Sequence, residues 1–157
     1  MSTLGTAALV GDAIVAELGG AGPVGGWPLA FAASRLWMPL LSLSPGSTVP
    51  QLAGTQISVV PDAMPTDERL TRALQRQVYE YFLLVQAKVN DQSDASIDPL
   101  ANLLEVVKDW FFRDQHVLAT GPTARCVAAS FPTMAWRPHL EMFAYTGVAA
   151  LSFEVDQ

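Results

Sequence analysis

Residues 79–89 alternate in a way that an extended strand satisfies best. Apolar side chains recur at every second position, as Tyr79, Tyr81, Leu83, Val85, Ala87 and Val89. Alternate residues of a strand lie on one face of a sheet, so these six share a face. The opposite face carries polar residues but also Phe82 and Leu84. The second face is therefore not simply exposed to solvent, and the chain must build a sheet that is partly apolar on both sides.

Apolar spacing elsewhere predicts two helices and four more strands. A first helix is expected over 6–18, and a second begins at Asp98 as N-cap, with Pro99 in its first turn, and continues to Phe111. The further strands are expected at 34–41, 56–60, 125–131 and 142–155, with a polar loop over 62–75 and a connection over 132–140. Gly147, inside the last strand, indicates a bulge or a close approach.

These elements follow the order α-β-β-β-α-β-β. The prediction is one α+β domain over residues 1–157, with an antiparallel or mixed sheet of about four or five strands and two helices packed on one face. Within it, residues 1–55 are rich in Gly, Pro and Trp, and residues 56–155 hold most of the regular pattern.

Charge is sparse and unevenly placed. The chain has 9 basic and 15 acidic residues, but residues 1–61 contain only Asp12, Glu17 and Arg35. A net charge of −6 opposes nonspecific binding to nucleic acid, which needs clustered basic residues. The uncharged N-terminal part also carries a cluster of large apolar residues: Trp27, Phe31, Trp37, Leu40 and Leu41. The cluster is either core or a candidate interface with another chain.

No motif predicts a catalytic, cofactor-binding or metal site. Cys126 is the only cysteine and lies in an apolar run, which is typical of a small buried side chain. The two histidines, His116 and His139, lack metal-ligand spacing. The acidic residues between 91 and 98 do not fit a calcium-binding loop, and we interpret them as a turn and a helix cap. The uncharged stretch 36–61 contains four prolines, which disfavour a membrane-spanning helix, so we expect a soluble chain made inside the cell.

Residues 56–155 resemble the tail-terminator (tail-completion) proteins of long-tailed bacteriophages. The resemblance depends on an ordered series of segments rather than on one motif: Ile57 to Pro61, a polar loop with Arg72, Tyr79 to Val89, Ile97 to Glu105, Trp136 to Glu141, and Phe143 to Phe153. Residues 1–55 depart from that pattern.

The resemblance implies a structural virion protein without enzymatic activity or cofactor. Its subunits would form a hexameric ring that caps the tail tube and meets the head-tail connector, with DNA passing through the lumen without specific binding. The chain would be assembled in the host cytoplasm and reside in the tail or neck of the virion. Two alternatives stay open: a head-completion or other neck adaptor, and a cytosolic ligand-binding or catalytic α+β domain with a deep pocket.

The polar loop contributes a second candidate surface. Asp67, Glu68, Arg69 and Arg72 interrupt an otherwise weakly charged region. We interpret this loop as a docking arm for the tail tube; the alternative is a solvent-exposed loop without a binding role.

Overall fold

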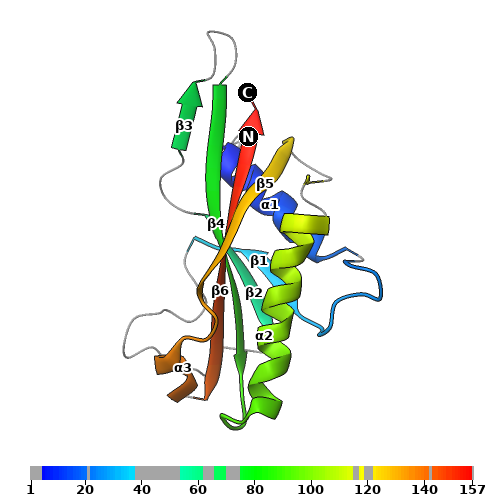
Figure 1. Cartoon of the computed structure of the whole chain (residues 1–157), viewed down its shortest axis with the longest axis vertical. Helices are drawn as coiled ribbons and strands as arrows, with labels where there is room; N and C mark the ends of the chain where they lie inside the picture. Colours follow the sequence, from blue (N-terminus) through cyan, green and yellow to red (C-terminus); the bar gives the residue numbers. More distant parts are fainter. Residues whose placement is uncertain are drawn as a thin grey trace, which may run out of the picture.

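The chain folds as an α+β structure that consists of one mixed sheet and helices packed against it (Figure 1). The computed structural model describes residues 5–20, 22–37, 54–61, 66–69, 75–114, 117–118, 122–141 and 143–156. Along the chain the elements are α1 (Thr6–Leu18), β1 (Ala32–Arg35), β2 (Gln56–Pro61), β3 (Thr66–Arg69), β4 (Gln75–Lys88), α2 (Asp94–Asp109), the π-helical turn η1 (Trp110–Asp114), β5 (Ala124–Thr133), α3 (Arg137–Glu141) and β6 (Ala144–Asp156). The predicted α+β class is confirmed.

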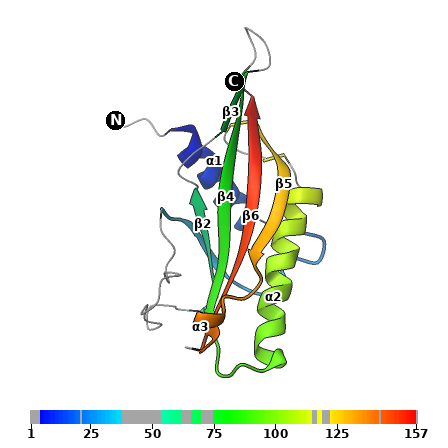
Figure 2. The ribbon, with the colours of Figure 1, turned by 60° about the vertical axis from the view of Figure 1, so that its left-hand side comes forward.

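The sheet is built around β4 and β6. Its strand order is β1-β2-β4-β6-β5, and all neighbours are antiparallel except β1 and β2, which are parallel. β4 and β6 pair along almost their whole length, from Arg76 opposite Asp156 to Lys88 opposite Ala144. β3 pairs with the outer end of β4, on the edge that β2 leaves after Pro61. These two long strands run through the middle of the molecule (Figure 2).

The core lies between the helices and one face of the sheet. It contains the alternating apolar residues of β4 together with Val10 and Ile14 of α1 and Leu103 and Leu104 of α2. Both helices therefore cover the same face, as the sequence predicts. We call the opposite side of the sheet, which carries Phe82 and Leu84, the second face.

The second helix begins one turn earlier than the sequence indicates. α2 starts at Asp94, after Ser93 as N-cap, and includes Pro99. Asp91 organises this start, because its Oδ1 accepts hydrogen bonds from the backbone N–H and hydroxyl of Ser93 and from the hydroxyl of Ser96. Ala95 and Pro99 are exposed, so water can satisfy the carbonyl that a proline in the helix leaves without its N–H donor.

Two regions expected to be irregular contain short elements. The polar loop 62–75 includes β3, and the connection 132–140 leads into α3. The first strand, expected at 34–41, is observed as β1 from Ala32 to Arg35, and residues 38–41 lie outside the described residues. Gly147 marks a close approach rather than a bulge: a Cβ there would lie 2.8 Å from Leu104 Cδ2. The register irregularities lie in β5 instead, between Cys126 and Ala128 and between Ser130 and Thr133.

Candidate functional site

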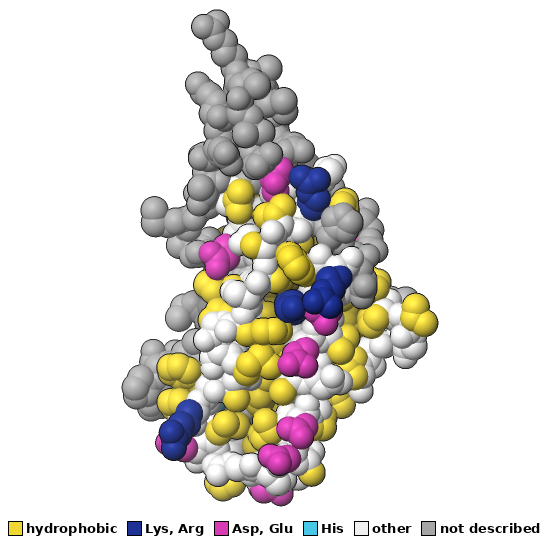
Figure 3. All heavy atoms as spheres, viewed as in Figure 1, with side chains coloured by type: hydrophobic (Ala, Val, Ile, Leu, Met, Phe, Trp, Pro, Cys, Tyr) yellow, Lys and Arg dark blue, Asp and Glu magenta, His cyan; other side chains and the backbone are white. Residues whose placement is uncertain are grey.

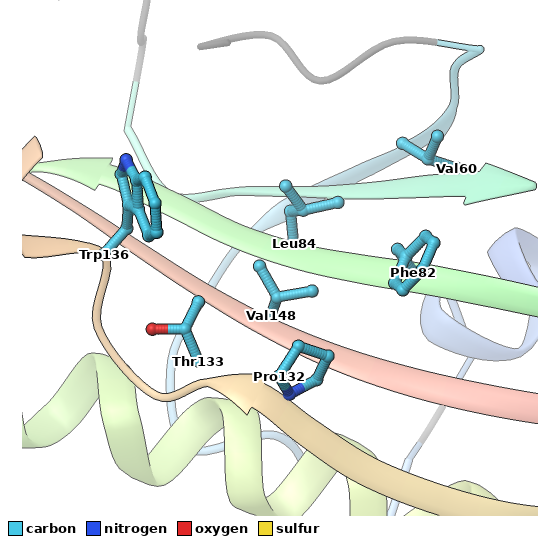
Figure 4. A pocket seen from close by; sticks show the side chains of 7 residues that line it. All are labelled: Val60, Phe82, Leu84, Pro132, Thr133, Trp136 and Val148. Carbon is cyan, nitrogen blue, oxygen red and sulfur yellow. The ribbon is translucent and has the colours of Figure 1, made fainter. Parts of the chain in front are cut away.

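The second face of the sheet carries an apolar hollow of about 360 Å³. Seven residues line it: Val60, Phe82, Leu84, Pro132, Thr133, Trp136 and Val148. Figure 4 shows Leu84, Phe82 and Val148 along the middle of the hollow, with Trp136 at one end. We call this feature the apolar hollow.

Strand register brings the lining residues together from distant parts of the sequence. Val60 lies opposite Phe82, and Leu84 lies opposite Val148. Thr133 pairs with Val148 at the end of β5, so the chain forms one wall of the hollow as it leaves the sheet. Because alternate strand residues share a face, Val60 of β2, two residues of β4 and Val148 of β6 make a continuous floor.

A buried polar group fastens α3 at the end of the second face. His139 Nδ1 lies 2.7 Å from Thr146 Oγ1, and Gln86 Nε2 donates to the same oxygen at 3.2 Å. The Thr146 hydroxyl accepts from Gln86 and can donate to His139, which makes Nδ1 the acceptor nitrogen in this arrangement. The backbone N–H of Trp136 also donates to the Thr146 carbonyl at 2.7 Å. These bonds hold the Trp136 backbone, and with it one end of the apolar hollow, against β6.

The chemistry of the apolar hollow suits an apolar partner rather than a reacting one. None of its seven lining residues carries a charge. Its polar side-chain atoms are the Thr133 hydroxyl and Trp136 Nε1, and the latter is buried and has no acceptor in the part of the chain that the structure describes. A buried N–H without an acceptor is unfavourable.

The titratable groups with shifted pKa values belong to the packing of the fold. Burial raises the pKa of the Cys126 thiol to about 11, as expected for the small buried residue that the sequence predicts. Burial likewise raises the pKa of Tyr81, whose hydroxyl donates to the Ala7 carbonyl at 2.6 Å. Hydrogen bonds from Ser93 and Ser96 lower the pKa of Asp91. Among the described residues, no group of His, Cys, Asp and Glu is arranged to hold a metal ion.

The structure divides the predicted interface cluster. Trp27 and Phe31 are partly buried and pack against the core, where the Trp27 ring meets Phe31 and Trp110 edge to face at 5.6 and 5.9 Å. Trp37 differs, because 63% of its surface is exposed. Leu40 and Leu41 lie outside the described residues. In the view of Figure 3, hydrophobic side chains show over much of the face, between charged groups of which several lie next to one another.

The predicted docking residues lie at one end of the sheet. Asp67, Glu68 and Arg69 belong to β3, which pairs with residues 75–77 of β4. Arg72 lies outside the described residues. β3 and the adjoining end of β4 extend beyond the part of the sheet that the helices cover (Figure 1).

Sequence reasoning identified Phe82 and Leu84 as apolar residues of the second face, but it missed the apolar hollow. Its other walls come from β2, β6, the end of β5 and the turn before α3, and only the strand register shows that they meet. The available signal was the apolar character of both faces of β4, which predicts a second layer or a partner without identifying it.

None of the described helices combines the length and the apolar character that crossing a membrane requires. In comparisons with known proteins, the chain matches no family model and no curated protein. Its function must therefore be inferred from its own surfaces.

Proposed function

We propose that the chain is a structural subunit of a phage-like tail, a tail terminator that forms a ring on the tail tube and joins it to the head-side connector. The observation that carries this proposal is a pair of unlike apolar surfaces on one subunit, the apolar hollow and the exposed Trp37. Rings are built from heterologous contacts, which need two different complementary patches on each copy. The order of segments over residues 56–155 supports the tail assignment.

The position of β3 supports a role for the polar segment as a docking arm. It pairs with Gln75 to Val78 at one end of β4, which places the segment at one end of the sheet. Deletion of residues 63–73 is therefore expected to leave a folded subunit that joins tubes poorly. A folded deletion variant with normal joining would contradict the arm.

The direct experiment is assembly of the purified chain, alone and with tail tubes. Native mass spectrometry and electron microscopy are expected to show closed rings, and labelled protein is expected at tube ends. A chain that remains monomeric and binds neither tubes nor connector would refute the proposal. Its position in an intact particle separates a tail terminator from a head-completion or other neck adaptor.

One observation favours a second candidate, a ligand-binding domain. The apolar hollow lies within the roughly 300–1,000 Å³ typical of small-molecule sites. However, such sites usually place several polar groups to orient the ligand, whereas five of the seven lining side chains have no hydrogen-bonding group, and only Thr133 and Trp136 carry one. Tight binding of a small apolar ligand by a monomeric chain would favour this candidate.

A further inference from the structure

We propose that Trp37 of one copy inserts into the apolar hollow of the next copy and so joins the subunits head to tail. The inference depends on the ring proposed above and identifies its central contact. Four observations support it: the exposure of Trp37, the way Trp37 is held, the position of the two surfaces, and the charges beside them.

Trp37 is an exposed aromatic side chain with a fixed neighbour. The Arg35 guanidinium carbon lies 5.5 Å from the centre of the indole ring, in cation–π geometry. Arg35 is itself held by Asp12, whose Oδ1 accepts from Nε at 2.6 Å. An aromatic group that is oriented before binding loses less conformational freedom when it is buried. Tryptophan is also enriched among the residues that dominate interface energies.

The apolar hollow offers the complementary surface. Its floor is made by side chains of three sheet strands, so it is a preformed feature rather than one that a loop must create. Its size suits one large side chain with its flanking backbone.

The two surfaces lie on opposite sides of a subunit. Arg35, which covers the Trp37 ring, reaches α1, where its side chain lies against Gly11 and pairs with Asp12. The apolar hollow lies on the second face, away from α1 and α2. Trp37 is 63% exposed and so does not fill the hollow of its own chain. A contact between these unlike surfaces is heterologous, and repetition of it produces a ring or a filament.

Charge favours this pairing over contact between like surfaces. Arg35, whose Nε is paired with Asp12, places a guanidinium group beside Trp37. Glu80 lies two residues from Phe82 on β4 and shares the second face with it, which places a carboxylate beside the apolar hollow. Complementary charges at the rim of an interface guide its orientation and disfavour wrong partners.

The contact area assigns Trp37 the role of an anchor. A buried tryptophan covers roughly 150–250 Å², whereas a stable interface of standard size buries about 800 Å² on each partner. The surfaces around Trp37 and around the apolar hollow must therefore meet as well. Loss of such an anchor is expected to weaken self-association by roughly 30-fold or more, which corresponds to the threshold for an interface hot spot.

Two variants separate the two halves of the contact. Trp37→Ala removes the inserted side chain, and Thr133→Arg places a bulky cation at the wall of the apolar hollow. Phe112→Ala is the control for loss of an exposed aromatic, since Phe112 is 40% exposed on η1. Thr123→Arg is the control for the added cation, since Thr123 is exposed and does not line the hollow. Near-ultraviolet circular dichroism verifies that all four variants are folded.

Native mass spectrometry of single variants and of mixtures provides the test. We expect rings from the wild type and both controls, and monomers from Trp37→Ala and Thr133→Arg alone. An equimolar mixture of these two should give heterodimers and nothing larger, because Thr133→Arg supplies an intact tryptophan and Trp37→Ala supplies an intact hollow. The heterodimer then has neither a free Trp37 nor an intact free hollow, so no third copy can bind.

Each other outcome overturns a specific statement. Rings that persist in Trp37→Ala show that the anchor is wrong while the proposed ring survives. If only Thr133→Arg prevents rings, the apolar hollow receives a different segment, either of the neighbour or of its own chain, and the assignment of Trp37 fails. A mixture that stays monomeric also refutes the contact. A wild-type chain that is monomeric under all conditions refutes both this contact and the proposed function.

Discussion

Replacement of Gly147 by alanine should destabilise the fold, because the packed site around Gly147 has no space for the added methyl group. The new Cβ would lie 2.8 Å from Leu104 Cδ2 on α2 and 2.8 Å from the Met134 carbonyl oxygen. It would also collide with the Tyr145 hydroxyl, which donates a hydrogen bond to that same carbonyl. Gly147 therefore occupies a position where β6, α2 and the turn before α3 converge.

The expected cost follows from three contributions. Overfilling a packed site typically costs about 1–3 kcal/mol, and a weakened hydrogen bond adds about 1 kcal/mol. The reduced entropy of the unfolded chain offsets about 0.4–1 kcal/mol. The net loss is about 1–3 kcal/mol, and a loss of about 2 kcal/mol lowers Tm by about 4–8 °C in a chain of this size.

Urea unfolding at one fixed protein concentration measures this loss and removes the effect of self-association. Gly19→Ala is the matched control, since its new Cβ would meet only backbone oxygens at ordinary distances of 3.6 and 3.7 Å. Tyr145→Phe tests the mechanism, because it removes the hydroxyl with which the new methyl collides. The double variant should be less destabilised than the sum of the two single variants, by about 0.5 kcal/mol or more. A Gly147→Ala chain as stable as wild type, or strictly additive effects, would refute this account of the site.

Three smaller predictions concern other packed groups. The Cys126 thiol should resist alkylation in the native state at pH 8, because burial raises its pKa to about 11. The contribution of this thiol to the free energy of unfolding should be complete below the pKa of the unfolded chain and should fall as the pH rises toward 11. Urea unfolding at several pH values measures that fall. Tyr81→Phe should lower the free energy of unfolding by about 1 kcal/mol, since it removes the hydrogen bond that ties β4 to the Ala7 carbonyl of α1; an unchanged urea midpoint would contradict this. Asp12→Ala should change the free energy of unfolding by less than about 1 kcal/mol, because the carboxylate is half-exposed. It should nevertheless weaken assembly severalfold, because it releases Arg35 from its position over Trp37. Equal assembly of the variant and the wild type in light scattering would contradict this reasoning.

Local pattern predicted the parts of the fold that depend on local chemistry. The alternation over 79–89 identified β4 and its core face, and the helical spacing near Val10 and Leu103 identified α1 and α2. The start of α2 was misplaced because Asp98 and Pro99 are strong start signals, whereas the cap provided by Asp91 depends on side-chain hydrogen bonds that a pattern does not reveal. β3 exists because the long β4 extends beyond β2, a property of the whole sheet.

The candidate site was less predictable for the same reason. Trp27 and Trp37 are the same residue type in the same uncharged region, but the ring of Trp27 is taken up by Phe31 and Trp110. Trp37 lies two residues beyond the end of β1, where its side chain remains exposed. The sequence left open whether this cluster is core or interface, and among its described members the contacts of Trp27 with Phe31 and with Trp110 of η1 leave Trp37 as the exposed aromatic.

The pairing of β4 with β6 has a consequence for how the chain acquires its structure. β6 follows every other described strand in the chain, yet it lies between β4 and β5 in the sheet. Arg76 must find Asp156, a contact between residues far apart in sequence, and such contacts slow folding. While a ribosome is still making residues 144–156, β4 is without its main partner and presents an unpaired apolar edge. Folding should thus be late and exposed to aggregation, so the nascent chain is a natural client for chaperones.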